Sequence, residues 1–174
     1  MTTTILHSTE FLQAPAAKLY LLDFGLFQVH ENNRIIDIPG YLIVTMSGEK
    51  ILVDTGFPAQ YAHNPDEAAL EDGLESFGRV LHLTEDNLPP GQLARIGLTP
   101  ADIDLLVLTH SDIDHIGGID HFADVPVIIA APSAICCSVS KFSRILSAVI
   151  SRMKYQTVAF EGTTFGWSPP STIT

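Results

Sequence analysis

The feature that most constrains the fold is the stretch LLVLTHSDIDHIGGI at residues 105–119, in which an apolar run leads directly into a polar cluster. Four potential metal ligands fall close together in this cluster: His110, Asp112, Asp114 and His115. A continuous apolar run is typical of a strand that is covered on both faces in an α/β protein. Because α/β proteins place their sites in loops at the carboxyl ends of strands, the stretch predicts a functional site at the end of this strand.

The residue types in this cluster indicate metal binding. Imidazole nitrogens and carboxylate oxygens are ordinary ligands for zinc and for other first-row metals. Four such side chains at this density cannot all reach one ion from one face of a regular element, so the loop must turn sharply. Gly117 and Gly118 allow the backbone to pass close to its neighbours there. The alternative is that Asp112 and Asp114 are turn or helix-capping residues and that the histidines are surface polar groups.

The rest of the chain predicts one α/β unit. Strands are expected at residues 18–27, at 125–130, and in a hairpin formed by residues 41–46 and 50–53 with Gly48 in its turn. Residues 92–96 favour a helix that ends at Gly97, and Thr99 and Pro100 favour the start of another. Apolar spacing predicts an amphipathic helix over residues 135–150, and the last twenty residues can hold a short strand. Residues 57–90 are expected outside the core, as a surface loop or lid with a short helix.

Composition excludes several classes of function. A length of 174 residues fits one domain, which we expect to span residues 1–174. The net charge of -11 argues against nucleic-acid binding, which requires a basic face. No secretory signal pattern begins the sequence, and no apolar run approaches the ~18 residues of a membrane span, so a soluble cytoplasmic protein with no membrane contact is expected. The adjacent Cys136 and Cys137 imply no disulfide framework.

Several segments resemble the metallo-β-lactamase fold superfamily. THSDIDHIGG is similar to the signature His-x-His-x-Asp-His with one substitution, and KILVDTGFP at residues 50–58 resembles the strand ending in Asp-x-Gly that lies under the metal site. Within the superfamily, KLYLLDFG, PGYLIVTMSGEKILVDTGFP and ARIGLTPADIDLLVLTHSDIDHIGGIDHFADVPVIIA are most similar to N-acyl-homoserine lactone lactonases. The resemblance covers residues 18–132 and implies a metal-dependent hydrolase that acts on a small-molecule lactone or other ester-type bond.

The resemblance also implies roles for individual residues. His110 would bind a first zinc ion, and Asp114 and His115 would bind a second. Asp114 would in addition act in catalysis by steering a bridging hydroxide, whose pKa the metals lower towards ~7 and which attacks the substrate carbonyl. Asp54 would orient the loop through hydrogen bonds and would not bind metal itself.

One departure from the signature concerns the ligands. The position of the family's second histidine holds Asp112. A carboxylate can still bind the first metal, but it makes the pocket harder and more negative, which shifts the preference from zinc towards iron or manganese. The alternative is that Asp112 abolishes the first site. Superfamily members with an acidic residue here can also hold a di-iron centre that reduces oxygen or nitric oxide, but they normally need a flavin domain, which this sequence lacks.

A second departure concerns the later ligands of the family. The last of the seven histidines is His121, and the only carboxylate after Asp124 is Glu161. The expected fold is therefore a partial αββα metallo-β-lactamase sandwich that lacks its C-terminal half. Three explanations stay open: a truncated and inactive or non-catalytic fragment, a second chain that supplies the missing half, or substitute ligands from His63, His82 or His121.

Overall fold

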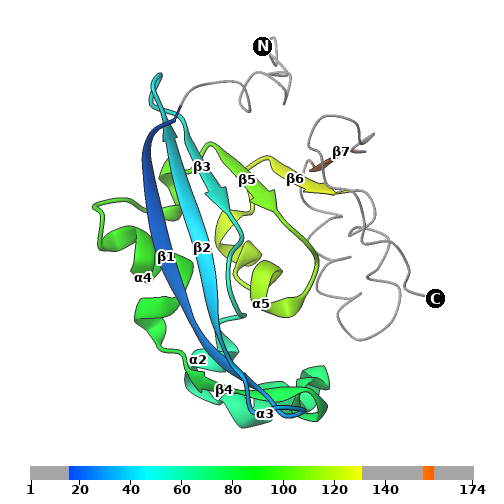
Figure 1. Ribbon diagram of the computed structural model, residues 1–174. Coiled ribbons are helices and arrows are strands. Elements are labelled where there is room, and N and C mark those ends of the chain that lie inside the picture. The colour runs from blue at the N-terminus through cyan, green and yellow to red at the C-terminus, as the bar shows by residue number, and fades with distance from the viewer. Residues whose placement is uncertain (1–15, 131–154, 159–174) are drawn as a thin grey trace, which may run out of the picture.

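The structure, a computed structural model, describes residues 16–130 and 155–158 (Figure 1). Its centre is one 7-stranded sheet with the strand order β4-β1-β2-β3-β5-β6-β7. The strands are β1 (Ala16–Val29), β2 (Ile35–Thr45), β3 (Lys50–Val53), β4 (Gly78–His82), β5 (Leu105–Leu108), β6 (Val127–Ala130) and β7 (Tyr155–Val158). The helices are α2 (Gln60–His63), α3 (Pro65–Asp72), α4 (Pro89–Ala94) and α5 (Ile113–Ile116), with the 3-10 helices η1 (Leu74–Ser76), η2 (Glu85–Asn87), η3 (Pro100–Asp102) and η4 (Ile119–Phe122).

The sheet is mixed, and its two halves have different pairing. Strands β4, β1, β2 and β3 pair antiparallel, while β3, β5, β6 and β7 pair parallel. Parallel neighbours need a crossover, and the chain between β3 and β5 carries α2, α3, β4 and α4. Because β3 and β5 are parallel with Val53 opposite Val107, their carboxyl ends meet at the same edge of the sheet. Figure 1 shows the chain turning back from the end of β5 into α5.

The main hydrophobic core lies on the face of the sheet that the helices cover. Leu42, Leu52 and Leu106 point into it from three neighbouring strands and are fully buried. The helices contribute buried side chains to the same cluster, among them Tyr61, Leu93, Ile113, Ile116, Ile119 and Phe122. This alternation of inward and outward side chains is the pattern expected of strands with one covered face.

The opposite face of the sheet is also apolar. Ile51, Leu105 and Ile128 form a second, smaller buried cluster there. Towards β1 and β2 the side chains of this face become exposed, as at Leu19, Leu21 and Tyr41. None of the helices in the described part of the chain has the length and apolar composition that a membrane-spanning helix requires.

Most predicted strands are confirmed. The strand at 18–27 lies within β1, the hairpin is formed by β2 and β3 with Gly48 at a φ of 99°, and β6 and β7 occupy the expected segments. The structure extends β2 back to Ile35, well before the predicted start, so β1 and β2 form a long antiparallel ladder. The amphipathic helix predicted at 135–150, with Cys136 and Cys137, lies outside the described residues.

The expectation that residues 57–90 lie outside the core is wrong. Phe57 and Tyr61 are buried, with ring centroids 5.1 Å apart, and Ala68 and Ala69 of α3 belong to the same core cluster. Strand β4 also comes from this segment and pairs with β1 at the edge of the sheet. Helices α2 and α3 are short, and each buries only one or two side chains. The sequence therefore shows no repeat of apolar residues at helical spacing here.

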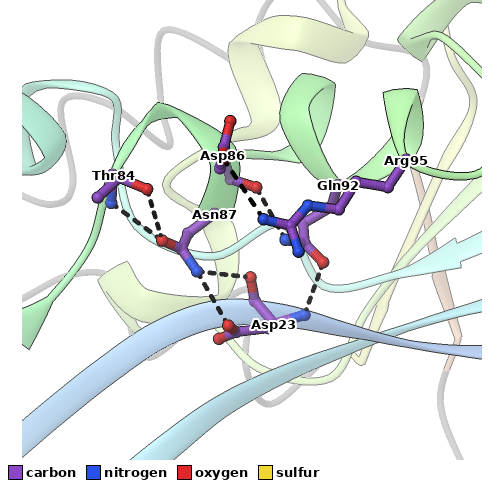
Figure 2. A network of polar contacts seen from close by, with 6 residues as sticks. All are labelled: Asp23, Thr84, Asp86, Asn87, Gln92 and Arg95. Atoms are coloured by element: carbon purple, nitrogen blue, oxygen red, sulfur yellow. Dashed lines mark hydrogen bonds and ion pairs between the residues drawn. The ribbon is translucent and has the colours of Figure 1, made fainter.

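The chain from η2 to α4 is held against β1 by a polar network, which Figure 2 shows. The buried Asn87 side chain donates to the backbone oxygen of Asp23 at 3.3 Å and to its carboxylate at 3.0 Å, and accepts from Thr84 N at 3.0 Å. The side chain of Gln92 accepts from Asp23 N at 3.0 Å and donates to Asp86 O at 2.8 Å. Helix α4 begins at Pro89, three residues before the predicted start at residue 92. Gly97 follows this helix with a φ of 75°.

Thr99 caps the next helix, as predicted, through a capping box with Asp102. That helix, η3, is a short 3-10 turn. Pro100 stands at its start, as expected of a residue that lacks an N–H to donate.

Candidate metal centre

The framework of the site is the edge where β3 and β5 end side by side. Asp54 follows β3, and its backbone N–H donates to Val107 O at 2.9 Å. The residue has a φ of 61°, a left-handed conformation that is uncommon outside glycine but tolerated by aspartate. Its side chain is buried, with 3% relative exposure for the residue. A strained, buried carboxylate at the end of a strand is typical of a functional site.

The loop after Asp54 holds α5 in place through its backbone. Thr55 donates to His115 O from its backbone N at 2.7 Å and from its hydroxyl at 2.9 Å. Gly117 N donates to Gly56 O at 2.8 Å. A Cβ atom at Gly117 would overlap Pro58, so glycine is required for this approach. The predicted close passage of the backbone at this glycine is confirmed.

Three of the four predicted ligands come together. His110, Asp114 and His115 each offer a ligand atom, and these atoms all lie within 4.8 Å of one another. The rings of His110 and His115 have centroids 3.9 Å apart. All three residues are partly buried, as expected of a site that is open to solvent on one side. Asp112 does not belong to this group, and its side chain is 75% exposed.

Two nitrogen–oxygen distances at the site are compatible with a shared cation as well as with a long hydrogen bond. His110 Nε2 lies 3.4 Å from Asp112 Oδ2, and His115 Nε2 lies 3.4 Å from Asp114 Oδ2. Good N–H···O bonds are shorter, between about 2.7 and 3.2 Å. Bonds of about 2.1 Å in a zinc tetrahedron place neighbouring ligand atoms about 3.4 Å apart. The chemistry and spacing of His110, Asp114 and His115 therefore fit a metal ion, while Asp112 lies beside His110 outside this group.

A single carboxylate lies behind both histidines. Asp54 Oδ2 is 2.9 Å from His115 Nδ1 and accepts a hydrogen bond from the Thr109 hydroxyl at 2.8 Å. Asp54 Oδ1 accepts from Thr109 N at 2.8 Å. The Thr109 hydroxyl also lies 2.9 Å from His110 Nδ1. Each ring therefore has its Nδ1 occupied on the protein side, which leaves Nε2 for a ligand.

The charge environment favours a cation at His115, whose pKa is raised to about 9. Burial of the ring acts against protonation and lowers the pKa, but the hydrogen bonds and negative charges of Asp114 and Asp54 raise it by more. A metal ion on Nε2 can supply the same positive charge once the proton has left.

The histidines considered as substitute ligands lie outside this group. His63 Nε2 pairs with Glu85 Oε1 at 2.9 Å, and His121 packs edge-on to the ring of Phe122. His82 belongs to β4, opposite Leu26. Among the residues that the structure describes, only the group of His110, Asp114 and His115 brings three potential ligands together.

Sequence reasoning did not single out Thr55 or Thr109. Thr55 directly follows Asp54 and Thr109 directly precedes His110, and both lie at the ends of predicted strands. The signal that could have found them is the parallel pairing of β3 with β5, which brings the residues after both strands to one edge.

Comparison with known proteins decides the family. The profile of the metallo-beta-lactamase superfamily matches residues 38–134, more than half of the chain. The chain belongs to the metallo-β-lactamase superfamily. The matched segment contains Asp54, Thr109 and all four predicted ligands.

Relatives within the superfamily include lactonases. An N-acyl homoserine lactonase from a Bacillus species is 35% identical over 118 residues, which is 66% of this chain and 46% of the relative. A solved structure of an N-acyl homoserine lactone hydrolase, with the product N-hexanoyl-L-homoserine bound at its catalytic metal centre, has a TM-score of 0.67 at 22% identity. The similarity covers 87% of this chain and 63% of that one. A dizinc quorum-quenching lactonase, AidC, has a TM-score of 0.56 at 18% identity, covering 84% of this chain and 60% of that one.

These comparisons also show how much of the fold the chain contains. It spans less than half the length of the Bacillus relative, and about 60% of the solved chains. The fold is thus an α/β sheet of the metallo-β-lactamase type that corresponds to part of those proteins. This agrees with the partial sandwich expected from the sequence.

Proposed function

We propose that this chain carries the metal-binding part of a hydrolase that opens a lactone or another ester-type bond in a small molecule. The observation that carries the proposal is the convergence of His110, Asp114 and His115 at the edge of the sheet, with Asp54 bonded behind them. The superfamily match includes these residues, and relatives of the chain include N-acyl homoserine lactonases.

The geometry supports two metal positions. His110 and Asp112 are proposed to hold the first ion, and Asp114 and His115 the second, because each pair has the nitrogen–oxygen spacing of neighbouring ligands. Zinc is the first expectation, since AidC is described as a dizinc enzyme. The carboxylate of Asp112 also favours iron or manganese at the first position. Each ion needs further ligands, which water or other parts of the protein would supply.

A divalent metal in this group would polarise an ester carbonyl and would lower the pKa of a bound water. The role proposed for Asp114 is to bind the second ion and to orient the attacking water. What supports this role is that its carboxylate is 26% exposed to solvent and lies 3.4 Å from the ring nitrogen of His115. Asp54, at 5% side-chain exposure, is too buried to contact a substrate and serves only to orient.

A second candidate function is that of a non-catalytic fragment of such a hydrolase. The chain spans only part of its relatives, and the described residues provide three clustered ligands where two metal ions need more. Such a fragment would still bind one ion. Metal binding without turnover is therefore the result expected of this candidate.

The experiment that separates the two candidates is lactone hydrolysis by the zinc-loaded full-length chain, with N-hexanoyl-L-homoserine lactone as substrate. For the hydrolase, Asp114→Asn should lower kcat/KM by at least about a hundredfold. Asp124→Asn, a matched change at an exposed residue outside the group, should leave kcat/KM unchanged. A chain that retains zinc but hydrolyses no lactone is the non-catalytic fragment.

A further inference from the structure

The hydrogen bonds behind the histidines fix where their protons lie. Asp54 Oδ2 receives two contacts, from the Thr109 hydroxyl at 2.8 Å and from His115 Nδ1 at 2.9 Å. A carboxylate only accepts hydrogen bonds, so both partners must be donors. The single hydroxyl proton of Thr109 is therefore committed to Asp54, and the N–H of His115 lies on Nδ1.

The proton of His110 is fixed through the same hydroxyl group. Its Nδ1 lies 2.9 Å from the Thr109 hydroxyl oxygen, which has already given its only proton to Asp54. This oxygen can act only as an acceptor towards the ring, so His110 Nδ1 must carry a proton. The neutral ring then presents a bare Nε2, the atom that faces Asp112 Oδ2 at 3.4 Å.

We propose that Thr109 is a positioning residue that holds His110 in its metal-binding tautomer by relaying the negative charge of Asp54. This inference rests on the proposed metal site and names a residue that acts on a ligand without binding the metal. One buried carboxylate then sets both histidines, His115 directly and His110 through the Thr109 hydroxyl.

The relay is needed because of the substitution at position 112. Neutral imidazole in water favours a proton on Nε2, and Asp112 Oδ2 stands beside that nitrogen in His110 as a ready acceptor. Without the Thr109 hydroxyl, the proton of His110 would move to Nε2 and point at Asp112. A metal would then have to displace this proton, which weakens its binding.

The test uses Thr109→Val, which keeps the shape of the side chain but removes the hydroxyl, and Thr109→Ser, which restores the hydroxyl. We expect Thr109→Val to weaken zinc binding by about tenfold, the lower end of the effect of groups that orient ligands, because Thr109 is itself exposed. Thr109→Ser should restore binding to near the wild-type value. The matched control is Thr99→Val, which removes a hydroxyl bonded to Asp102 at 2.7 Å but contacts no histidine, and which should bind zinc as the wild type does.

A second readout needs no metal. Nitrogen-15 NMR of the neutral His110 ring should place the proton on Nδ1 in the wild type and in Thr109→Ser, and on Nε2 in Thr109→Val. Far-UV circular dichroism of each variant shows that the fold is kept.

The proposal is overturned if the His110 proton lies on Nε2 in the wild type, or if Thr109→Val binds zinc as tightly as Thr109→Ser. A wild type that binds no zinc but keeps the Nδ1 proton would instead contradict the proposed function. It would leave the tautomer relay standing.

Discussion

At the scale of single residues, Asp54 combines an unfavourable backbone with an unusually full set of partners. It adopts a φ of 61°, and its carboxylate receives hydrogen bonds from Thr109 N, from the Thr109 hydroxyl and from His115. The energetic cost of this conformation is offset by the hydrogen bonds, which hold the ends of β3 and β5 next to each other. The carboxylate thus links the stability of the sheet edge to the geometry of the candidate ligands.

Asp54→Asn tests this link. Asparagine tolerates the same φ, but its NH2 group must face one of the N–H or O–H donors that now contact the carboxylate. We expect the free energy of unfolding to fall by about 1–3 kcal/mol in a urea titration. Zinc affinity should fall by about 10- to 100-fold. Asn33→Asp is the control, because Asn33 is the other non-glycine residue described with a positive φ, at 55°, and is exposed. A large loss of zinc affinity in this control would contradict the argument.

The residue types of the site could be predicted from the sequence, and the family resemblance predicted that Asp54 orients the loop through hydrogen bonds, which the structure confirms; the particular partners of Asp54 could not be predicted. His110, Asp114 and His115 are close in sequence, so their proximity follows from one loop. The bonds from Asp54 to Thr109 and His115 cross 55 and 61 residues, and they depend on which strand lies beside β3. No local pattern in the sequence specifies that pairing.

At the scale of elements, the segment from η2 to α4 is attached to β1 by buried polar side chains in addition to its apolar packing. Asn87 and Gln92 are 4% and 5% exposed, and both bond to Asp23. Figure 2 shows that the two side chains reach Asp23 from neighbouring turns. The attachment matters for the site, because Pro89 at the start of α4 lies against Gly118, just beyond the candidate ligands.

Asn87→Ala should release this attachment. It leaves Oδ2 of Asp23 and the backbone N–H of Thr84 without this partner, and we expect a loss of about 2–3 kcal/mol in the free energy of unfolding. Arg95→Ala removes only an exposed ion pair to Asp86 at 3.5 Å, so its effect should stay within about 0.5 kcal/mol. Equal effects of the two changes, measured by urea unfolding, would contradict this assignment.

The elements that the sequence predicts well are those whose residues all favour the same local structure. The apolar run of β5 and the turn at Gly48 identified a strand and a hairpin, because each follows from local preferences. The sequence does not predict the contribution of residues 57–90 to the core, because Phe57 is buried against a distant strand. Phe57 packs against Phe27 of β1, with ring centroids 6.1 Å apart.

At the scale of the whole molecule, the sheet has one face covered by helices and one face that becomes exposed towards β1 and β2. Neighbouring leucines of β1 show the difference directly. Leu22 is 3% exposed and belongs to the main core, while Leu21 is 71% exposed on the other face. Two leucines at successive positions are therefore expected to contribute very differently to the free energy of unfolding.

Alanine at each position measures this difference. Leu22→Ala should lower the free energy of unfolding by about 2–5 kcal/mol, the usual cost of emptying a core site. Leu21→Ala should change it by no more than about 0.5 kcal/mol. Urea unfolding of both variants gives the comparison. Equal losses would mean that the outer face is covered in solution, which is not what the exposure of Leu21 predicts.

The central claim is that the group of His110, Asp114 and His115 binds metal, and metal content tests it most directly. The measurement is elemental mass spectrometry of the full-length chain after zinc loading and desalting. The expected result is about one to two zinc ions per folded chain, lost in a His110→Ala/His115→Ala double variant and kept in a His63→Ala/His82→Ala control. A wild type that retains no zinc, or a His110→Ala/His115→Ala variant that retains as much as the wild type, would contradict the account.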